Sequence, residues 1–201
     1  MAGKPLHEFL SYDDLRPIAE RFLAQHHPAG TIPVPIEEII DLRFKMDIVP
    51  LPGLRDSFDI DAFISRDLTT IHVDEFIYKH RPCRLRFSLA HELSHAVLHK
   101  AVFSQLAFDS VAEWKQEVLG IAEDDYRFLE WQANALAGLI LVPSAVLAGV
   151  YRQAVGLLPS VGLSLAIEPA WPYVLDYVAK QFDVSSEVID RRIRYDGLRP
   201  G

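Results

Sequence analysis

The chain has 201 residues, half of them hydrophobic, and a formal net charge of −8 with an isoelectric point of about 5.4. This length and hydrophobic content predict one main globular domain, and the acidic balance argues against a general nucleic-acid-binding protein. The one cysteine, Cys83, excludes an internal disulfide and any metal site built on paired cysteines. The sequence contains no apolar run of membrane-spanning length and no signal peptide at its start. We therefore expect a cytoplasmic protein that does not contact a membrane.

The first third of the chain predicts helices followed by a small sheet. Residues 11–26 carry apolar residues at helical spacing, and Ser11 with Asp14 three residues later predicts an N-cap and an acidic first turn. The elements expected next are a short helix at 36–44, a strand at 46–51, and two strands at 60–65 and 69–74 that form a hairpin. We expect Pro50 and Pro52 to end the first of these strands.

From residue 82 onward the sequence predicts helices almost throughout. Pro143 interrupts the apolar run 135–150, which predicts two buried helical segments, and 178–193 is typical of helix, turn, helix with Ser185 as the second N-cap. We predict an α+β fold. Its expected parts are a helical N-terminal extension at 1–34, a main domain at 35–195 that closes with a helix pair at 172–195, and a tail at 196–201.

The stretch RFSLAHELSHAVLHK, residues 86–100, places three histidines and a glutamate in an apolar helical run. His91 and His95 are four residues apart, so they lie on one helix face, and this spacing suits two imidazoles that bind one metal ion at about 2.0–2.1 Å. Glu92 can then take a proton from the water that the metal activates and pass it to a leaving amine. The pattern is H-E-x-x-H, the signature of zinc peptidases.

The bare pattern also occurs by chance, and the alternative is a surface helix with satisfied histidines; the apolar context favours the metal site. A zinc hydrolase needs a third protein ligand and an open fourth position. Leu98 and Ala101 stand where the metzincin extension requires Gly and His, which excludes that class. His99 lies two turns beyond His91, about 12 Å along the axis, so we expect it in the core or behind a ligand.

We expect the third ligand from a later helix, and Glu130 is the best candidate. The segment 128–143 is strongly apolar, and a carboxylate embedded in it needs the compensation that a metal supplies. Asn134, one turn further on, is placed to orient Glu130. Other available carboxylates are Glu113, Glu117, Glu123, Asp124 and Asp125. The residues 123–125 are more typical of an acidic first turn of the same helix.

Two stretches, RFSLAHELSHAVLH and EWQANALAGLILVP, together resemble the ImmA/IrrE family of bacterial and phage metallopeptidases. In that family an H-E-x-x-H helix is followed by a helix with an E-x-x-A-N pattern that ends in an aliphatic run and a proline. The resemblance covers roughly residues 35–195 and includes the strand TTIHVDEF and the closing segment VAKQFDVSSEVIDRRI.

The resemblance implies that His91, His95 and Glu130 bind one Zn²⁺, or another divalent ion such as Mn²⁺. It implies that Glu92 is the catalytic residue of a metallo-endopeptidase. Family members often cleave a helix-turn-helix repressor encoded beside them, so such a protein is the expected substrate and partner. The implied fold is a small antiparallel or mixed sheet packed on a mostly helical, zincin-like domain.

Two segments depart from the family pattern. Residues 100–127 between the motifs are long, and residues 156–170 look like an insertion; either is a candidate for a lid or a substrate wall. A second donor to the oxyanion is also expected. The candidates of the right chemical kind are Arg86, His99, Tyr126, Tyr151 and Tyr173.

A DNA-binding regulator is the first alternative, because 178–199 is typical of two helices joined by a turn. Positive charge gathers at its end, on Arg191, Arg192, Arg194 and Arg199. Asp190 and Asp196 dilute this charge, and a helix pair is a common packing unit. We expect no direct DNA binding.

Two further alternatives keep the metal site. The chain is then a non-catalytic protein-binding regulator, such as a partner in a toxin–antitoxin pair, or a zinc hydrolase for small molecules. A structural zinc site needs four protein ligands, and the intact Glu92 favours turnover. An extended groove favours a peptide substrate and a closed pocket a small molecule.

Overall fold

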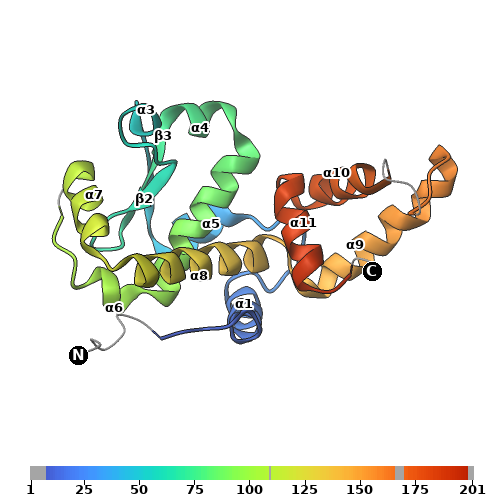
Figure 1. Ribbon diagram of the computed structural model, residues 1–201, viewed down its shortest axis with the longest axis horizontal. Coiled ribbons are helices and arrows are strands. Elements are labelled where there is room, and N and C mark those ends of the chain that lie inside the picture. Colours follow the sequence, from blue (N-terminus) through green and yellow to red (C-terminus); the bar gives the residue numbers. More distant parts are fainter. Residues whose placement is uncertain (1–7, 109, 166–169, 199–201) are drawn as a thin grey trace.

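The computed structural model describes residues 8–108, 110–165 and 170–198, and two long helices form its centre. Helices α5 (Pro82–Leu98) and α8 (Glu123–Leu141) pack against each other (Figure 1). Their buried apolar residues belong to one core that also includes residues of the sheet and of most other helices. The result is the α+β fold that the sequence predicts.

Strands β1 (Asp47–Leu51), β2 (Ala62–Ile64) and β3 (Thr70–Asp74) form a mixed sheet in the order β1-β3-β2. Strands β2 and β3 make the predicted antiparallel hairpin, whereas β1 runs parallel to β3. The prediction that Pro50 ends the first strand is wrong, because Pro50 lies within β1 in register with Val73. An edge strand tolerates a proline, since its outer side has no partner strand.

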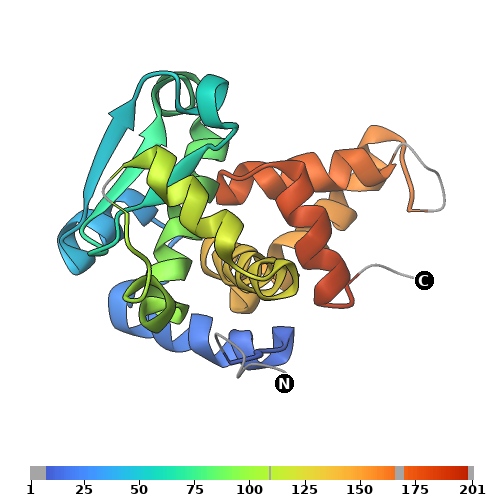
Figure 2. The ribbon, with the colours of Figure 1, turned by 60° about the vertical axis from the view of Figure 1, so that its left-hand side comes forward.

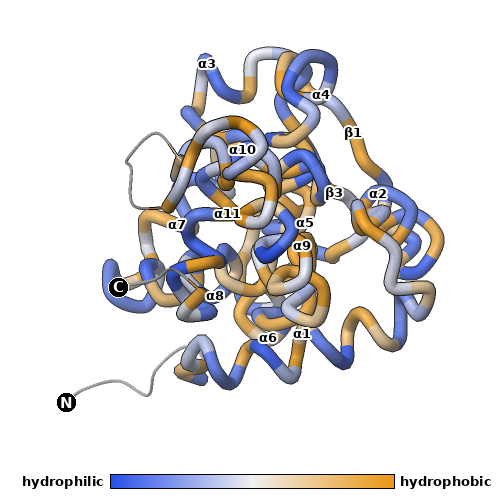
Figure 3. The backbone as a smooth tube through the Cα atoms, turned by 90° about the vertical axis from the view of Figure 1, so that its right-hand side faces the viewer, coloured by the Kyte–Doolittle hydropathy of each residue, from blue (hydrophilic) through white to orange (hydrophobic). Residues whose placement is uncertain are grey.

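Helix α1 (Tyr12–His26) begins with the predicted N-cap. The Ser11 hydroxyl accepts a hydrogen bond from the Asp14 N–H, and the Asp14 carboxylate accepts one from the Ser11 N–H at 2.9 Å. This reciprocal arrangement satisfies two otherwise unpaired N–H groups. Hydrophilic and hydrophobic residues alternate along α1 at the lower edge of Figure 3, and its apolar face packs against α8. Helix α1 is therefore built into the common core.

The other helices connect and close these elements. They are α2 (Ile36–Glu38), the π-helix η1 (Ile39–Phe44), α3 (Leu54–Phe58), α4 (Glu75–His80), α6 (Lys100–Phe103), α7 (Val111–Gly120), α9 (Ser144–Leu157), the 3₁₀ helix η2 (Leu158–Val161), α10 (Ala170–Phe182) and α11 (Ser186–Tyr195). Helices α2 and η1 together occupy the predicted 36–44 helix. As predicted, Pro143 separates α8 from α9, and the Ser185 hydroxyl caps α11. Part of the predicted 156–170 insertion, residues 166–169, lies outside the described residues.

Helix α7 lies between the hairpin and the start of α8 (Figures 1 and 2), yet it contributes no buried residue to the core. The Trp114 ring contacts the Phe63 ring at 5.8 Å between centroids, and the Lys115 ammonium donates a hydrogen bond to the Phe58 carbonyl at 2.8 Å. The helix is therefore attached to the sheet region by a few contacts at its surface.

Arg192 joins the end of α8 to α11. Its guanidinium donates hydrogen bonds to the backbone carbonyls of Gly138, at 2.8 Å, and of Val142. It also donates to the Ser144 hydroxyl at 3.0 Å and the Asp196 carboxylate at 2.9 Å. The last carbonyls of a helix lack intrahelical partners and carry partial negative charge, so a buried cation satisfies them well.

We expect Arg192→Ala to lower the free energy of unfolding by about 3 kcal/mol, because it strips a buried carboxylate and several carbonyls of their donor. Asp196 keeps a second partner, Arg16 at 2.7 Å, which limits the loss. Urea unfolding followed by circular dichroism measures the change. Arg191→Ala is the matched control: this neighbour is exposed, pairs with Glu187 at the surface, and should cost less than about 1 kcal/mol. Equal losses in the two variants would contradict the role given to Arg192.

Among the described residues, no single helix has both the length and the apolar character needed to cross a membrane. The segments Glu123–Leu141 and Ser144–Val161 meet these criteria only when they are taken together, across a break bent by 66°.

Candidate metal centre

Helix α5 presents His91 and His95 on one face. Pro82 occupies its first turn, where a missing N–H costs nothing, and apolar residues such as Leu89 and Leu93 bury another face in the core. The four-residue spacing puts the two imidazoles one turn apart, and their Nε2 atoms are 3.0 Å from each other. Both rings therefore aim the same kind of nitrogen at one point.

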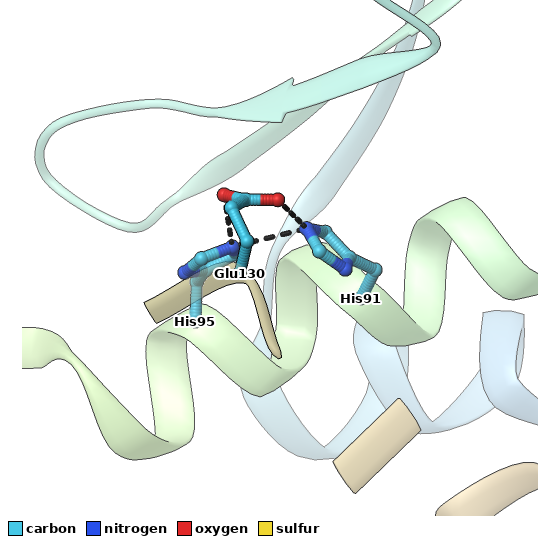
Figure 4. A group of neighbouring side chains, drawn as sticks. All are labelled: His91, His95 and Glu130. Carbon is cyan, nitrogen blue, oxygen red and sulfur yellow. Dashed lines mark hydrogen bonds and ion pairs between the residues drawn. The ribbon is translucent and has the colours of Figure 1, made fainter. Parts of the chain in front are cut away.

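Glu130 on α8 completes this cluster from the opposite helix (Figure 4). One carboxylate oxygen lies 3.3 Å from His91 Nε2 and the other lies 3.4 Å from His95 Nε2. The structure thus brings together the three residues that the sequence singles out as candidate ligands, although 35 positions separate His95 from Glu130 in the chain.

The separations fit a single tetrahedral ion. An ion with ligands about 2.0–2.1 Å away holds any two ligand atoms about 3.3 Å apart. The distances between the donor atoms of His91, His95 and Glu130 are 3.0, 3.3 and 3.4 Å. Two imidazoles and one carboxylate are also a donor set found in catalytic zinc sites, where a fourth position stays open. The three residues therefore form a cluster able to hold a metal ion.

The electrostatics of the cluster favour a cation. Burial alone would raise the pKa of the Glu130 carboxyl, but hydrogen bonds with His91 and His95 hold that pKa well below its ordinary value. Burial opposes a charge on His91, yet its hydrogen bond to Glu130 and the nearby charges of Glu92 and Glu130 raise its pKa. Two carboxylates in one buried site thus favour a positive charge beside them, and a divalent ion supplies that charge directly.

Glu92 lies beside the cluster and lines the same cavity. Glu92 is 7% exposed. Burial raises the pKa of its carboxyl, although the charges on His91 and His95 oppose the rise. The carboxylate accepts a hydrogen bond from the backbone of Ile64 on β2. A buried carboxylate beside the clustered donors is suited to accept and return a proton.

His99 supports His95 from behind. Its Nδ1 lies 3.0 Å from His95 Nδ1, and its Nε2 lies 3.0 Å from the side-chain oxygen of Gln132. The Gln132 amide nitrogen donates to the Glu8 carbonyl at 3.0 Å, and this fixes which end of the amide faces His99. Because that end is an oxygen, the hydrogen-bond network assigns a proton to His99 Nε2 and another to His95 Nδ1. With Nδ1 engaged in this way, a neutral His95 carries its lone pair on Nε2 and can offer it to a metal ion in place of the contact with Glu130.

The chain of bonds agrees with the expected place of His99 and adds a residue that sequence reasoning missed. Gln132 is 1% exposed, and like Glu130 it is a polar side chain inside an apolar helical run. A polar side chain in an apolar run is a signal that the sequence contains. That Gln132 pairs with His99, however, follows only from the packing of α5 on α8.

We expect Gln132→Ala to weaken metal binding about 10–100-fold, because the His95 ring loses the partner that fixes its orientation and tautomer. Competition with a chromogenic chelator measures the affinity. Gln105→Ala is the matched control: this glutamine bonds to the Ala101 carbonyl at an exposed position, and its loss should leave the affinity unchanged. An unchanged affinity in Gln132→Ala would show that the bond is not needed to orient His95.

Asn134 contacts the cluster differently from the prediction. Its amide nitrogen donates to the Glu130 backbone carbonyl at 2.8 Å, and its side chain hydrogen-bonds to the His91 ring, which helps to raise the His91 pKa. Asn134 therefore orients a histidine and not the Glu130 carboxylate.

Tyr126 is the one candidate oxyanion donor that lines the cavity within the described part of the chain. Burial and the charges of Glu130 and Glu92 raise its pKa, and its hydroxyl hydrogen-bonds to Glu130, so it remains a donor. Arg86 instead fixes the fold by donating to the Val34 carbonyl at 2.7 Å. The other candidates, His99, Tyr151 and Tyr173, do not line the cavity.

The cavity over the cluster has a volume of about 340 Å³. One wall comes from the predicted 100–127 segment, which contributes Val102, Phe103, Leu106, Trp114, Val118, Ile121 and Tyr126. No described residue of the 156–170 segment lines it. The first segment thus forms one wall of the cavity, and the described part of the second does not.

The family model described as the IrrE N-terminal-like domain, peptidase family M78, matches residues 76–194. The chain belongs to this family. The match runs from α4 to α11, and so it includes both helices of the cluster. Membership places the chain among peptidase-type domains and agrees with the resemblance noted in the sequence. No curated protein sequence matches the chain significantly.

A solved structure of a Mycobacterium tuberculosis transcriptional regulator is similar to this family member, with a TM-score of 0.55 and 19% sequence identity. The similarity covers 90% of this chain and 55% of that one. At this identity the likeness concerns the fold alone, and the chain spans little more than half the length of that regulator.

Proposed function

We propose that the chain is a metal-dependent endopeptidase, with one ion, Zn²⁺ or a similar divalent ion such as Mn²⁺, held by His91, His95 and Glu130. The single observation that carries the proposal is the convergence of these donors at tetrahedral separations beside a buried glutamate. Family membership supports a peptidase, and the donor chemistry supports zinc.

A divalent ion at this site would polarise the scissile carbonyl and acidify a water molecule beside it. Glu92 is the general base that accepts the proton of the attacking water, and then the general acid that returns it to the leaving amine. Its raised pKa suits both steps, and the hydrogen bond from Ile64 holds the carboxylate over the cavity. Tyr126 is the proposed donor to the oxyanion, because it lines the cavity and its hydroxyl, which bonds to Glu130, can turn toward the substrate.

The shape around the site supports a polypeptide substrate over a small molecule. Arg84, Phe87, Ser88 and Asn134 line the cavity and also line a second groove that continues toward α11. A substrate longer than one residue can therefore extend out of the cavity, which an enclosed pocket would prevent.

A helix-turn-helix transcriptional repressor is the proposed substrate. The support comes from the family resemblance, and the structural neighbour titled a transcriptional regulator is in keeping with a link to transcription. The protein would act in the cytoplasm, where such a repressor binds DNA, and it would contact the repressor and not the DNA.

Incubation of the purified protein with a helix-turn-helix repressor, chosen first from genes that neighbour its own, tests this proposal. We expect the zinc-loaded wild type to produce two fragments by mass spectrometry, and expect none with Glu92→Gln or after chelation. Tight binding of the repressor by both proteins without cleavage would favour a non-catalytic regulator, such as a toxin–antitoxin partner, that retains its metal.

A further inference from the structure

We propose that the substrate segment next to the cleavage site carries a large apolar side chain, aromatic by preference, beside an acidic residue. The two would bind in a pocket on α8 and α11 that we call the arginine–aromatic pocket, formed around Trp131, Tyr195, Arg191 and Arg194. The inference rests on the proposed function, because it assigns the specificity of the same site.

The pocket is continuous with the metal cavity. Phe87 and Asn134 line the metal cavity, the intervening groove and the arginine–aromatic pocket alike. Each of the two lies one helical turn from a candidate ligand, Phe87 before His91 on α5 and Asn134 after Glu130 on α8. A substrate that leaves the cavity along these helices therefore reaches the pocket without crossing the core.

The distance fits a short extended peptide. Gly138, which lines the pocket, lies two turns beyond Glu130 on α8, about 12 Å along the helix axis. An extended chain advances about 3.3–3.6 Å per residue. The pocket thus receives a side chain three or four residues from the scissile bond.

Aromatic surfaces wall the pocket, which has a volume of about 550 Å³. The Tyr195 ring stacks on Tyr12 at 4.3 Å between centroids, and its hydroxyl accepts a hydrogen bond from the Trp131 indole at 3.4 Å. These contacts hold the rings in place before a ligand arrives. Rigid aromatic walls favour an aromatic or large aliphatic side chain, since rings pack edge to face or offset.

The rim of the pocket is cationic. The side chains of Arg191 and Arg194 are 58% and 63% exposed, and no Asp or Glu is among the described residues that line the pocket. Each guanidinium forms a surface ion pair within α11, with Glu187 and Asp190. Such pairs are weak, and an arginine has five N–H donors, so both can still bind a carboxylate of the substrate.

Single-stranded nucleic acid also binds aromatic and arginine side chains. The surroundings favour a peptide, because the adjoining groove mixes five acidic residues with four arginines and so offers no continuous cationic track for a phosphate backbone, and the whole chain carries a charge of −8. A nucleic acid carries a negative charge at every nucleotide, whereas the proposed peptide needs a cationic partner for one acidic residue only.

Binding to zinc-loaded Glu92→Gln tests the pocket without turnover. The probes are fluorescein-labelled dodecapeptides of alanine, serine and glycine that carry one Phe–Asp pair, with Phe–Lys and Ala–Asp versions for comparison. By fluorescence anisotropy we expect Phe–Asp to bind about tenfold more tightly than either. Binding of Phe–Asp and Phe–Lys within about twofold of each other would overturn the proposal.

Added substitutions locate the effect. Arg191→Glu with Arg194→Glu should abolish or reverse the preference for Phe–Asp over Phe–Lys, and Trp131→Ala should remove the preference for Phe over Ala. The matched control is Arg152→Glu with Lys180→Glu, an equal charge change on exposed residues outside the pocket, which should leave both preferences intact. Zinc content and thermal unfolding verify that each variant is folded.

Two results would refute the pocket while leaving the peptidase proposal intact. One is that the control lowers the Phe–Asp preference as much as the Arg191 and Arg194 variant does. The other is that single-stranded oligothymidylate binds more tightly than any peptide and loses binding in that variant. The peptidase proposal fails separately, if the wild type retains no metal or cleaves no substrate.

Discussion

Glu92→Gln is expected to lower kcat/KM for the repressor by about 10²–10⁴-fold, the range that a positioned acid–base group contributes. Glutamine keeps the size of the side chain but cannot accept a proton from water. Because Glu92 is not one of the three clustered donors, zinc content should stay at that of the wild type. Cleavage rates with zinc measured on the same samples by elemental analysis test both statements.

Glu20→Gln provides the control for Glu92→Gln, since Glu20 is an exposed glutamate on α1. It should leave rate and zinc content unchanged. Full activity in Glu92→Gln would remove Glu92 from the mechanism. Loss of zinc from that variant would instead show that Glu92 is a metal ligand. The fourth coordination position would then not be open to water.

Glu130→Ala is expected to lose the metal. In this variant only the two imidazoles remain as ligands. The metal ion loses the negative charge of the Glu130 carboxylate and its third protein ligand. We expect an affinity loss beyond the roughly 10–100-fold that outer contacts of a metal ligand contribute. Elemental analysis should find about one zinc per chain in the wild type and almost none in Glu130→Ala, with the same result for His91→Ala.

Glu123→Ala is the matched control for Glu130→Ala, because Glu123 is an exposed carboxylate in the first turn of the same helix. It should retain zinc. A wild type that carries no metal and gains none from added zinc or manganese would end the peptidase proposal. If Glu130→Ala keeps its zinc, a residue other than Glu130 must be the third ligand.

Local patterns in the sequence predicted what local geometry controls. The spacing of His91 and His95 determines that they share a helix face, and the capping box at Ser11 marks the start of α1. Glu130 was predicted by an energetic argument, since a carboxylate in an apolar helix needs a partner, and the structure places it between the two imidazoles.

Features that depend on packing between distant segments were not predicted. The parallel pairing of β1 with β3 brings together strands that no tight turn connects. The bond between His99 and Gln132 requires the register of α5 on α8. The oxyanion candidates could not be separated by residue type, because Arg86 and Tyr126 can both donate a hydrogen bond and only the fold shows that Tyr126 lines the cavity.

Because α7 is attached by few contacts, its sequence can change with little effect on folding stability, although the helix lines the cavity. Trp114 and Val118 of this helix line the cavity, yet no residue of the helix is fully buried. The floor, made by α5 and α8, cannot change without cost to folding. Under the proposed function, substitutions in α7 would therefore alter which substrate side chains fit in the cavity while the metal cluster on α5 and α8 persists, so related chains could acquire new targets by changing this wall alone.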